Sequence, residues 1–206
     1  MLGVSGAPSI SVSIVVLLVA VTALVSVAAW ASKSLRGAFV LNPYVVRQRG
    51  QVYRLLTAGF IHADAMHLLF NMMTLWFFAN GVVRILGVPR FLVLYLGAVV
   101  VGFVPTTLRY MRQPAYNSLG ASGAVAAVTF SAIALQPGLR VGIPFVPVLV
   151  PGIVYGVLYL AYSAWHSYRA RDGINHDAHF TGAVFGALLT YAFEPARVQR
   201  ALGHLI

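Results

Sequence analysis

A serine and a histidine stand out because each lies within an otherwise apolar stretch. Ser122 occurs in GASG, and His179 occurs in HDAHFTGAVFG. Polar and ionisable groups are costly to place in apolar surroundings, so such residues are candidates for function. A serine hydroxyl becomes an effective nucleophile when a base takes its proton, and a histidine with an ordinary pKa of about 6.5 can do so. The pair predicts acyl transfer, with Ser122 as nucleophile and His179 as general base.

Two further polar residues, His67 and Asn71, are spaced to supply hydrogen-bond donors. They are four residues apart in HLLFN and therefore share one face of a helix. Acyl transfer needs donors directed at the oxyanion that develops in the transition state. Backbone N–H groups at the start of the helix that follows Ser122 can add to this set. Gly120 and Gly123 allow the backbone to approach closely around the serine.

The sequence gives little support to a catalytic carboxylate or to a metal ion. The chain has four acidic residues, and Asp177 lies two positions before His179, on nearly the opposite face of a helix. A serine–histidine dyad is therefore the economical arrangement. His176 and His179 could chelate a metal, but no acidic partner is evident and the H-E-x-x-H motif is absent. The chain also lacks cysteine, which removes Cys-based zinc sites, and we predict no metal and no cofactor.

Each of these features also has a purely structural interpretation. A single histidine or asparagine in a membrane helix can serve only to bond a neighbouring helix, and a serine among glycines suits close helix packing. Gly182 and Gly186 alone form a helix-packing motif. The combination of all these features in one chain is what favours catalysis.

The chain that must position these residues has the composition of an integral membrane protein. Of its 206 residues, 60% are hydrophobic and 9% are charged, and the mean hydropathy is +0.84. Soluble domains carry about 25% charged residues, so a soluble enzyme, a disordered chain and a coiled coil are excluded. A spanning helix needs about 20 mainly apolar residues. We predict an all-α, polytopic fold in a single domain, residues 1–206, with six spanning helices at about 9–31, 67–86, 91–108, 122–135, 146–165 and 177–193.

The longest segment that is not predicted to span lies between the first two runs, from Ser32 to Met66. It mixes arginines with aromatic residues, which suits a loop lying in the membrane interface. Just before it, Ala29-Trp30-Ala31 resembles a signal-peptidase site. Because no Lys or Arg precedes the first apolar run, and because that run is longer than a signal core, we expect a spanning helix there.

The formal charge of +10 is spread singly between the apolar runs. This dispersion favours contact with lipid headgroups over nucleic-acid binding. No internal repeat is visible, which weakens the interpretation as an inverted-repeat transporter, although a small transporter or channel stays as an alternative.

In their order along the chain, GFIHADAMHLLFNMMTLWFF, GASG and HDAHFTGAVFG resemble the motifs of the rhomboid intramembrane serine proteases. The resemblance runs from about Asn42 to Tyr191 and includes the order of six helices. It implies Ser122 as nucleophile, His179 as general base, His67 and Asn71 as the oxyanion pair, and Gly120, Gly123, Gly182 and Gly186 as supporting glycines.

The same resemblance implies that Arg54 holds the first loop, with Tyr53 where the family has tryptophan, and that His62 is structural as well. One position departs from the family. In bacterial members an aromatic residue four positions after the nucleophile often packs on the base, but Ala126 stands there in this chain. The sequence does not identify the residue that supports the His179 ring.

The resemblance implies an intramembrane serine endopeptidase whose substrates are membrane proteins with one spanning segment, cut in or near that segment. It implies a multi-pass protein of the lipid bilayer, expected in a bacterial inner membrane. The alternative is an inactive relative that binds membrane clients. Both termini would be cytoplasmic, which leaves more basic residues outside than inside, against the usual positive-inside bias.

Two expectations concern the loops of this arrangement. The loop Ser32–Met66 and the loop Ser167–His176 should face the same, non-cytoplasmic side. The fifth helix and the loop SYRARDGINHD should be mobile and help to admit substrate, because Gly173 and Asn175 make that loop flexible.

Overall fold

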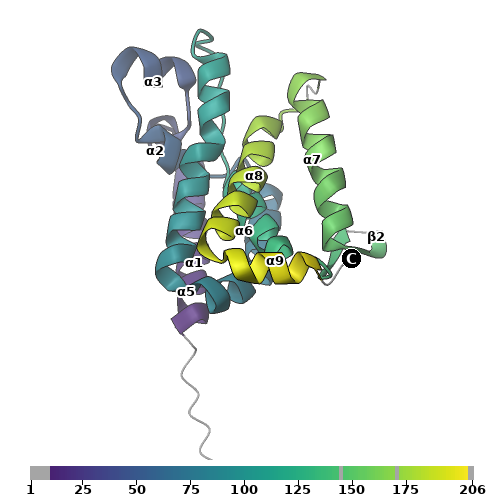
Figure 1. Cartoon of the computed structure of the whole chain (residues 1–206). Helices are drawn as coiled ribbons and strands as arrows, with labels where there is room; N and C mark the ends of the chain where they lie inside the picture. The colour runs from purple at the N-terminus through teal and green to yellow at the C-terminus, as the bar shows by residue number, and fades with distance from the viewer. Residues whose placement is uncertain (1–9, 144–145, 170–171, 204–206) are drawn as a thin grey trace, which may run out of the picture.

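Helices make up most of the computed structural model, which describes residues 10–143, 146–169 and 172–203 (Figure 1). The start of the first predicted helix, residue 9, lies outside these ranges. The helices are α1 (Ile10–Ala31), α2 (Lys33–Phe39), α3 (Pro43–Arg49), α4 (Arg54–Thr57), the 3-10 turn η1 (Ala58–Phe60), α5 (Ala65–Tyr110), α6 (Ser122–Leu135), α7 (Gly152–Arg169), α8 (His176–Phe193) and α9 (Pro195–Gly203); the strands are β1 (Arg140–Ile143) and β2 (Val146–Pro151).

The second and third predicted helices are the two arms of α5. The helix bends at Gly87, whose φ of 76° and ψ of 161° are not helical. Glycine adopts a positive φ at little cost, and Pro89 shortly after it cannot donate a backbone hydrogen bond to the preceding turn. The break predicted between residues 86 and 91 is therefore confirmed, although both arms extend slightly further than expected.

The prediction of a helix over residues 146–165 is wrong at its start. Residues Val146–Pro151 form strand β2, which pairs antiparallel with β1, and α7 begins only at Gly152. The sequence VPVLVP favours an extended chain, because it has β-branched valines at positions 146, 148 and 150. Its prolines at positions 147 and 151 are unfavourable inside a helix. A short apolar run does not distinguish strand from helix by hydropathy alone, which is why the hairpin was missed.

The fourth and sixth predicted helices match the structure closely. The α6 helix has the predicted range, Ser122–Leu135, and α8 starts at His176, one residue before the expected position. The amphipathic α9 was not expected. Within the described ranges, two helices are long and apolar enough to cross a membrane, namely Ile14–Ala31 of α1 and the whole of α5, and α6 is a shorter apolar helix. The six-span arrangement therefore stays a prediction.

The α6 helix forms the centre of the molecule, with nearly all its residues buried between α5 and α8. Its backbone touches that of α8. A Cβ at Gly182 would collide with the carbonyl group of Gly123, and one at Gly186 would collide with Ala127. A hydrogen bond of 2.7 Å from Thr190 Oγ1 to Ser131 Oγ joins the same two helices further along. Small residues thus let α6 and α8 approach closely enough to hold their side chains in a fixed relation.

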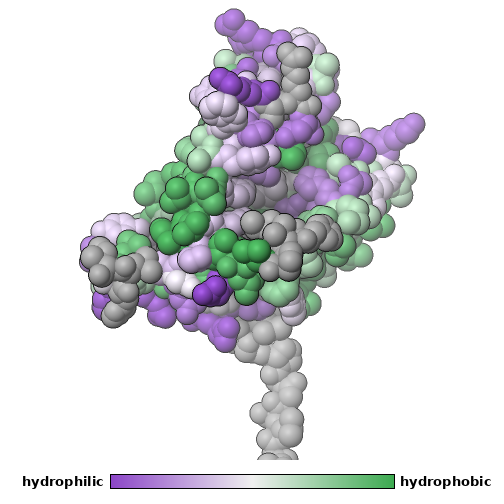
Figure 2. All heavy atoms as spheres, turned by 90° about the vertical axis from the view of Figure 1, so that its right-hand side faces the viewer, coloured by the Kyte–Doolittle hydropathy of each residue, from purple (hydrophilic) through white to green (hydrophobic). Residues whose placement is uncertain are grey.

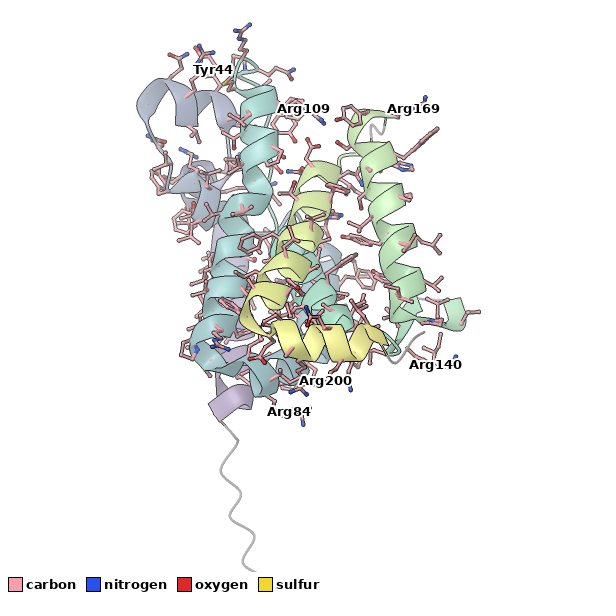
Figure 3. The ribbon with its side chains drawn as sticks, in the orientation of Figure 1. Tyr44, Arg84, Arg109, Arg140, Arg169 and Arg200 are labelled. Carbon is pink, nitrogen blue, oxygen red and sulfur yellow. The ribbon has the colours of Figure 1, made fainter. Side chains whose placement is uncertain are left out.

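The arginines labelled in Figure 3 lie at two ends of the molecule, and Tyr44 lies at one of them. Figure 3 places Tyr44, Arg109 and Arg169 at one end and Arg84, Arg140 and Arg200 at the other. Seen from the side of α7, hydrophobic side chains gather over the middle and lower part, and hydrophilic ones concentrate at the upper end and along the lower edge (Figure 2). An apolar belt between polar ends suits a lipid bilayer.

The first loop lies at the upper end and contains α2, α3, α4 and η1 (Figure 1). Arg54 holds it together from a buried position. Its Nη1 donates to the carbonyl oxygens of Gly37 and Val40, each at 2.7 Å, and its Nε donates to Gln51 Oε1 at 2.7 Å. The C-terminal end of α7 lies at this same end of the molecule (Figure 3).

Candidate functional site

Ser122 is the first residue of α6, and the turn before it is tied to the first loop. Gly120 has a φ of 112°, a backbone conformation that favours glycine, and its N–H donates to the Ala58 carbonyl at 2.9 Å. Earlier in the same segment, Ser118 forms an isolated antiparallel bridge with Leu41. The nucleophile candidate therefore stands at a helix start whose approach is fixed by residues far away in the sequence.

His62 is bonded to the residue directly before Ser122. The N–H of Ala121 donates to His62 Nε2 at 3.3 Å, so that nitrogen must be unprotonated. The opposite nitrogen, Nδ1, lies 3.0 Å from Ser26 Oγ, and this hydroxyl donates to the Phe60 carbonyl at 3.1 Å. His62 Nδ1–H is thus the donor to Ser26, and the ring is neutral.

The surroundings of His62 favour that neutral form. Its side chain is 1% exposed, and burial lowers the pKa of His62 to about 4, with a further contribution from the nearby His67 ring. The structural role implied by the sequence is therefore specific: the His62 ring connects α1, the first loop and the backbone beside Ser122.

The predicted oxyanion donors, His67 and Asn71, lie on the first two turns of α5. Asp64 caps this helix by accepting a 2.8 Å hydrogen bond from the His67 N–H. Asn71 is buried, and its Nδ2 donates to the His67 carbonyl at 2.8 Å, which leaves the second Nδ2 hydrogen for another acceptor. The His67 ring lies directly against Gly120.

His179 lies on the first turn of α8, opposite the start of α6. The two backbones approach so closely here that a Cβ at Gly123 would lie 3.0 Å from the Ala178 carbonyl oxygen. Asn175 caps α8: its Oδ1 accepts from the Ala178 N–H at 3.0 Å and from Thr106 Oγ1 at 2.8 Å.

Asn175 also fixes the loop before α8, because its Nδ2 donates to Ser118 Oγ at 2.9 Å. The Asn175 amide thus bonds to α5, to α8 and to the segment before Ser122, and the mobility expected of this loop stays a prediction. Residues 170–171 of the same loop lie outside the described ranges.

Five of the predicted site residues, Arg54 among them, line one cavity of about 1120 Å³, and the four predicted glycines do not. Polar groups from the first loop, the segment before α6 and the start of α8 complete its wall, which suits a water-filled space. Within the described ranges, no hydrogen bond joins the Ser122 hydroxyl to the His179 ring; such contacts often tighten only when substrate binds. The residues brought together on this wall are His67, Asn71, Ser122 and His179.

Asp177 contacts two other helices instead of the His179 ring. Its carboxylate forms a 2.8 Å ion pair with Arg109, at the end of α5, and accepts a hydrogen bond from Ser167 Oγ of α7. The Arg109 guanidinium also donates to the Ser167 carbonyl at 2.7 Å. Asp177 therefore fastens the end of α7 to α5 and α8, which agrees with the sequence argument against a catalytic carboxylate.

The other histidine of the motif, His176, is buried and has its Nε2 3.0 Å from Asp172 Oδ2. Hydrogen bonding to that ring, together with the Ile174 N–H, lowers the pKa of the Asp172 carboxyl. Across the described part of the chain, no group of three His, Cys, Asp or Glu residues is placed to hold a metal ion.

Tyr159 of α7 is a site residue that the sequence did not indicate. Its ring stacks on that of His179, with centroids 6.2 Å apart and planes inclined at 20°. With Ser122 and Ala126 it lines a second, smaller cavity of about 170 Å³. Tyr159 is therefore the aromatic residue that packs on His179, the candidate base, in a chain that has Ala126 four positions after Ser122.

The comparisons with known proteins point to one family. The model of the Rhomboid domain matches residues 49–195. The chain is 31% identical over 154 residues to "Presenilin-associated rhomboid-like protein, mitochondrial" of Bos taurus, covering 68% of this chain and 38% of that protein. It is 28% identical over 170 residues to "RHOMBOID-like protein 12, mitochondrial" of Arabidopsis thaliana, covering 73% of this chain and 50% of that protein.

A bacterial relative matches over more of its own length. "Putative rhomboid protease YdcA" of Bacillus subtilis (strain 168) is 30% identical over 154 residues, covering 73% of this chain and 72% of that protein. The chain thus spans half or less of the two mitochondrial relatives and most of the bacterial one.

Proposed function

Because the chain belongs to the rhomboid family of integral membrane proteins, we propose that it is an intramembrane serine endopeptidase with Ser122 and His179 as its dyad. The observation that carries the proposal is the shared cavity. The starts of α6 and α8, held in backbone contact at Gly123 and Ala178, present the two residues to the same polar space as His67 and Asn71.

In the proposed reaction, Ser122 Oγ attacks the carbonyl carbon of the scissile peptide bond while His179 accepts the hydroxyl proton. The carbonyl oxygen becomes an oxyanion. The protonated His179 then gives its proton to the leaving amine as the C–N bond breaks, which leaves an acyl-serine. Water attacks this ester with His179 again accepting a proton, and that proton returns to Ser122 Oγ as the acid is released.

The oxyanion would be stabilised by donors fixed before the reaction begins. The second Nδ2 hydrogen of Asn71, the ring of His67 and the N–H groups at the start of α6 all lie around the cavity. Asn71 is the best held of these, because its amide is buried and already bonded to the helix backbone.

The proposed substrates are membrane proteins with one spanning segment, cut in or near that segment. The family resemblance implies small residues at the cleavage site, and the cut segment must unwind locally because a helix shields its peptide bonds. Exposed apolar side chains on α1, α5 and α7, such as Leu24, Phe77 and Leu158, suit contact with lipid. Because relatives include mitochondrial and bacterial proteins, the bacterial inner membrane stays a prediction.

A fluorophosphonate probe tests the proposal directly, because it phosphonylates only an activated serine. The purified, folded protein should be labelled at Ser122, and Ser122→Ala should abolish both labelling and cleavage of a single-span substrate. A folded wild-type protein that is neither labelled nor active would refute the protease. If that protein still captured single-span clients, it would instead be an inactive client-binding member of the family.

A further inference from the structure

We propose that Tyr159 positions the His179 ring, so that the general base is correctly placed only while α7 packs on α6. The inference rests on the proposed function and concerns a residue that acts through the base. Tyr159 belongs to α7, whereas Ser122 and His179 belong to α6 and α8. Its ring lies 6.2 Å from that of His179, nearly parallel at 20°, which is an offset-stacked aromatic contact.

The His179 ring has few other restraints. Within the described residues, no carboxylate, carbonyl or hydroxyl forms a hydrogen bond with it, and the other ring beside it is that of His176, edge-on at 5.9 Å. The torsion that turns a histidine ring has broad minima, so packing must set the ring orientation where hydrogen bonds do not. The stacked ring of Tyr159 can set the orientation of the His179 ring by packing against it.

Tyr159 is itself well supported. Its ring lies 5.5 Å from that of Phe130 on α6 and 5.7 Å from that of Tyr155, one turn earlier on α7. The side chain packs against a buried cluster formed by Ala126, Phe130 and Ala183, from α6 and α8. The small side chain of Ala126 leaves the space on α6 into which the tyrosine from α7 fits.

The contact of Tyr159 with His179 depends on the position of α7, which is attached near its start and at its end. Near its start, α7 packs on α6 through two buried glycines: a Cβ at Gly152 would lie 3.1 Å from Ile133 Cγ1, and one at Gly156 would lie 3.5 Å from Phe130 Cε1. At its end, Ser167 bonds Asp177. Between these two attachments the outer face of α7 is exposed, as the 62% exposure of Val157 shows. A shift of α7 would therefore withdraw Tyr159 from the base without breaking the contact between α6 and α8.

The test compares substitutions at two neighbouring tyrosines in purified, folded protein. Tyr159→Phe keeps the stacked ring and, as the conservative variant, should retain most of the activity that Tyr159→Leu loses. Tyr159→Leu should lower kcat roughly 10-fold or more with little change in KM, because misplacing a catalytic group lowers the rate of the chemical step. Tyr155→Leu is the comparison variant: Tyr155 lines the same small cavity and stacks on Tyr159 but not on His179, so it can act on the base only through Tyr159 and its effect on kcat should be smaller than that of Tyr159→Leu.

Two further measurements separate positioning from substrate fit. The rate of labelling by a small alkyl fluorophosphonate should fall with kcat in Tyr159→Leu, because this probe does not fill the cavity as a peptide does. Adding Ala126→Phe to Tyr159→Leu supplies a ring from α6 and should recover part of the lost rate. If Tyr159→Leu does not fold, Tyr159→Met, which is flexible and of similar length, takes its place.

The outcomes discriminate between the two proposals. Normal labelling of Tyr159→Leu together with poor peptide cleavage would make Tyr159 a wall of the substrate pocket and would overturn the positioning role. Wild-type rates for both would overturn it as well. A wild-type protein without Ser122-dependent labelling would refute the protease, and the positioning role with it.

Discussion

A side chain at Gly120 would collide with the ring of His67, because a Cβ at that position would lie 2.7 Å from Cε1 and 3.0 Å from Nε2. The backbone there also has a φ of 112°. The turn before the nucleophile candidate therefore rests directly on the candidate oxyanion histidine, and two separate constraints require glycine.

Gly120→Ala should consequently impair both stability and catalysis. The unfavourable backbone conformation alone should cost about 1–3 kcal/mol of unfolding free energy. Displacement of the His67 ring should slow fluorophosphonate labelling by roughly 10²-fold. Gly138→Ala is the matched control, because a Cβ there meets nothing within 4 Å and its φ is not in the restricted region. Equal labelling of the two variants would contradict the contact.

The four residues on the cavity wall should differ in importance. Ser122→Ala should abolish cleavage, and His179→Ala should come close to doing so, because the hydroxyl loses its base. Asn71→Ala should be milder, with a loss of about 10²–10³ in rate, since backbone N–H donors remain. His67→Ala should lose the same amount or less. Cleavage of a single-span substrate by folded variants measures the order, and activity in Ser122→Ala with none in Asn71→Ala would reverse the assigned roles.

The lowered pKa of His62 predicts that the folded protein loses stability in mild acid. Its pKa is lowered to about 4 in the folded protein from an ordinary value near 6.5, so between those values the unfolded chain binds a proton that the folded chain does not. The contribution of neutral His62 to the free energy of unfolding is therefore fully present above about pH 6.5. It is lost as the pH is lowered toward 4, by up to roughly 3 kcal/mol. The thermal midpoint in detergent, followed across this range, gives the slope.

The matched variant for this prediction is His62→Gln, which removes the titrating group and keeps an amide able to bond. It should be less stable at pH 7, because the contacts with Ser26 and Ala121 are weakened. Its midpoint should also change less than that of the wild type between pH 6.5 and 4. An unchanged slope would mean that other groups cause the acid sensitivity.

The arrangement of the two ends predicts a labelling pattern in the membrane. The first loop and the end of α7 lie at the same end of the molecule, and Arg200 lies at the other (Figure 3). In this cysteine-free chain, Lys33→Cys and Tyr168→Cys should react with an impermeant thiol reagent from the same side, and Arg200→Cys should react from the opposite side. Opposite accessibility of the first two would exclude the predicted arrangement.

The polar motifs and most helix positions could be read from the sequence, because both depend on local patterns. Ser122, His179, His67 and Asn71 are recognisable as polar residues at motif spacing within apolar runs. The limits of α6 follow from composition alone, and Gly87 and Pro89 mark the bend of α5. Residues 146–151 form a strand that the sequence does not predict, because hydropathy does not distinguish a short apolar strand from the start of a helix.

The contacts that complete the site were decided by packing between segments far apart in the chain. Tyr159 meets His179 only because glycines bring α7 and α8 against α6, and nothing in the apolar run of α7 marks one tyrosine over its neighbours. His62 reaches the Ala121 N–H across 59 positions. Residue type and spacing determine which groups can do chemistry, whereas ring orientation and protonation state depend on neighbours that only the folded chain supplies.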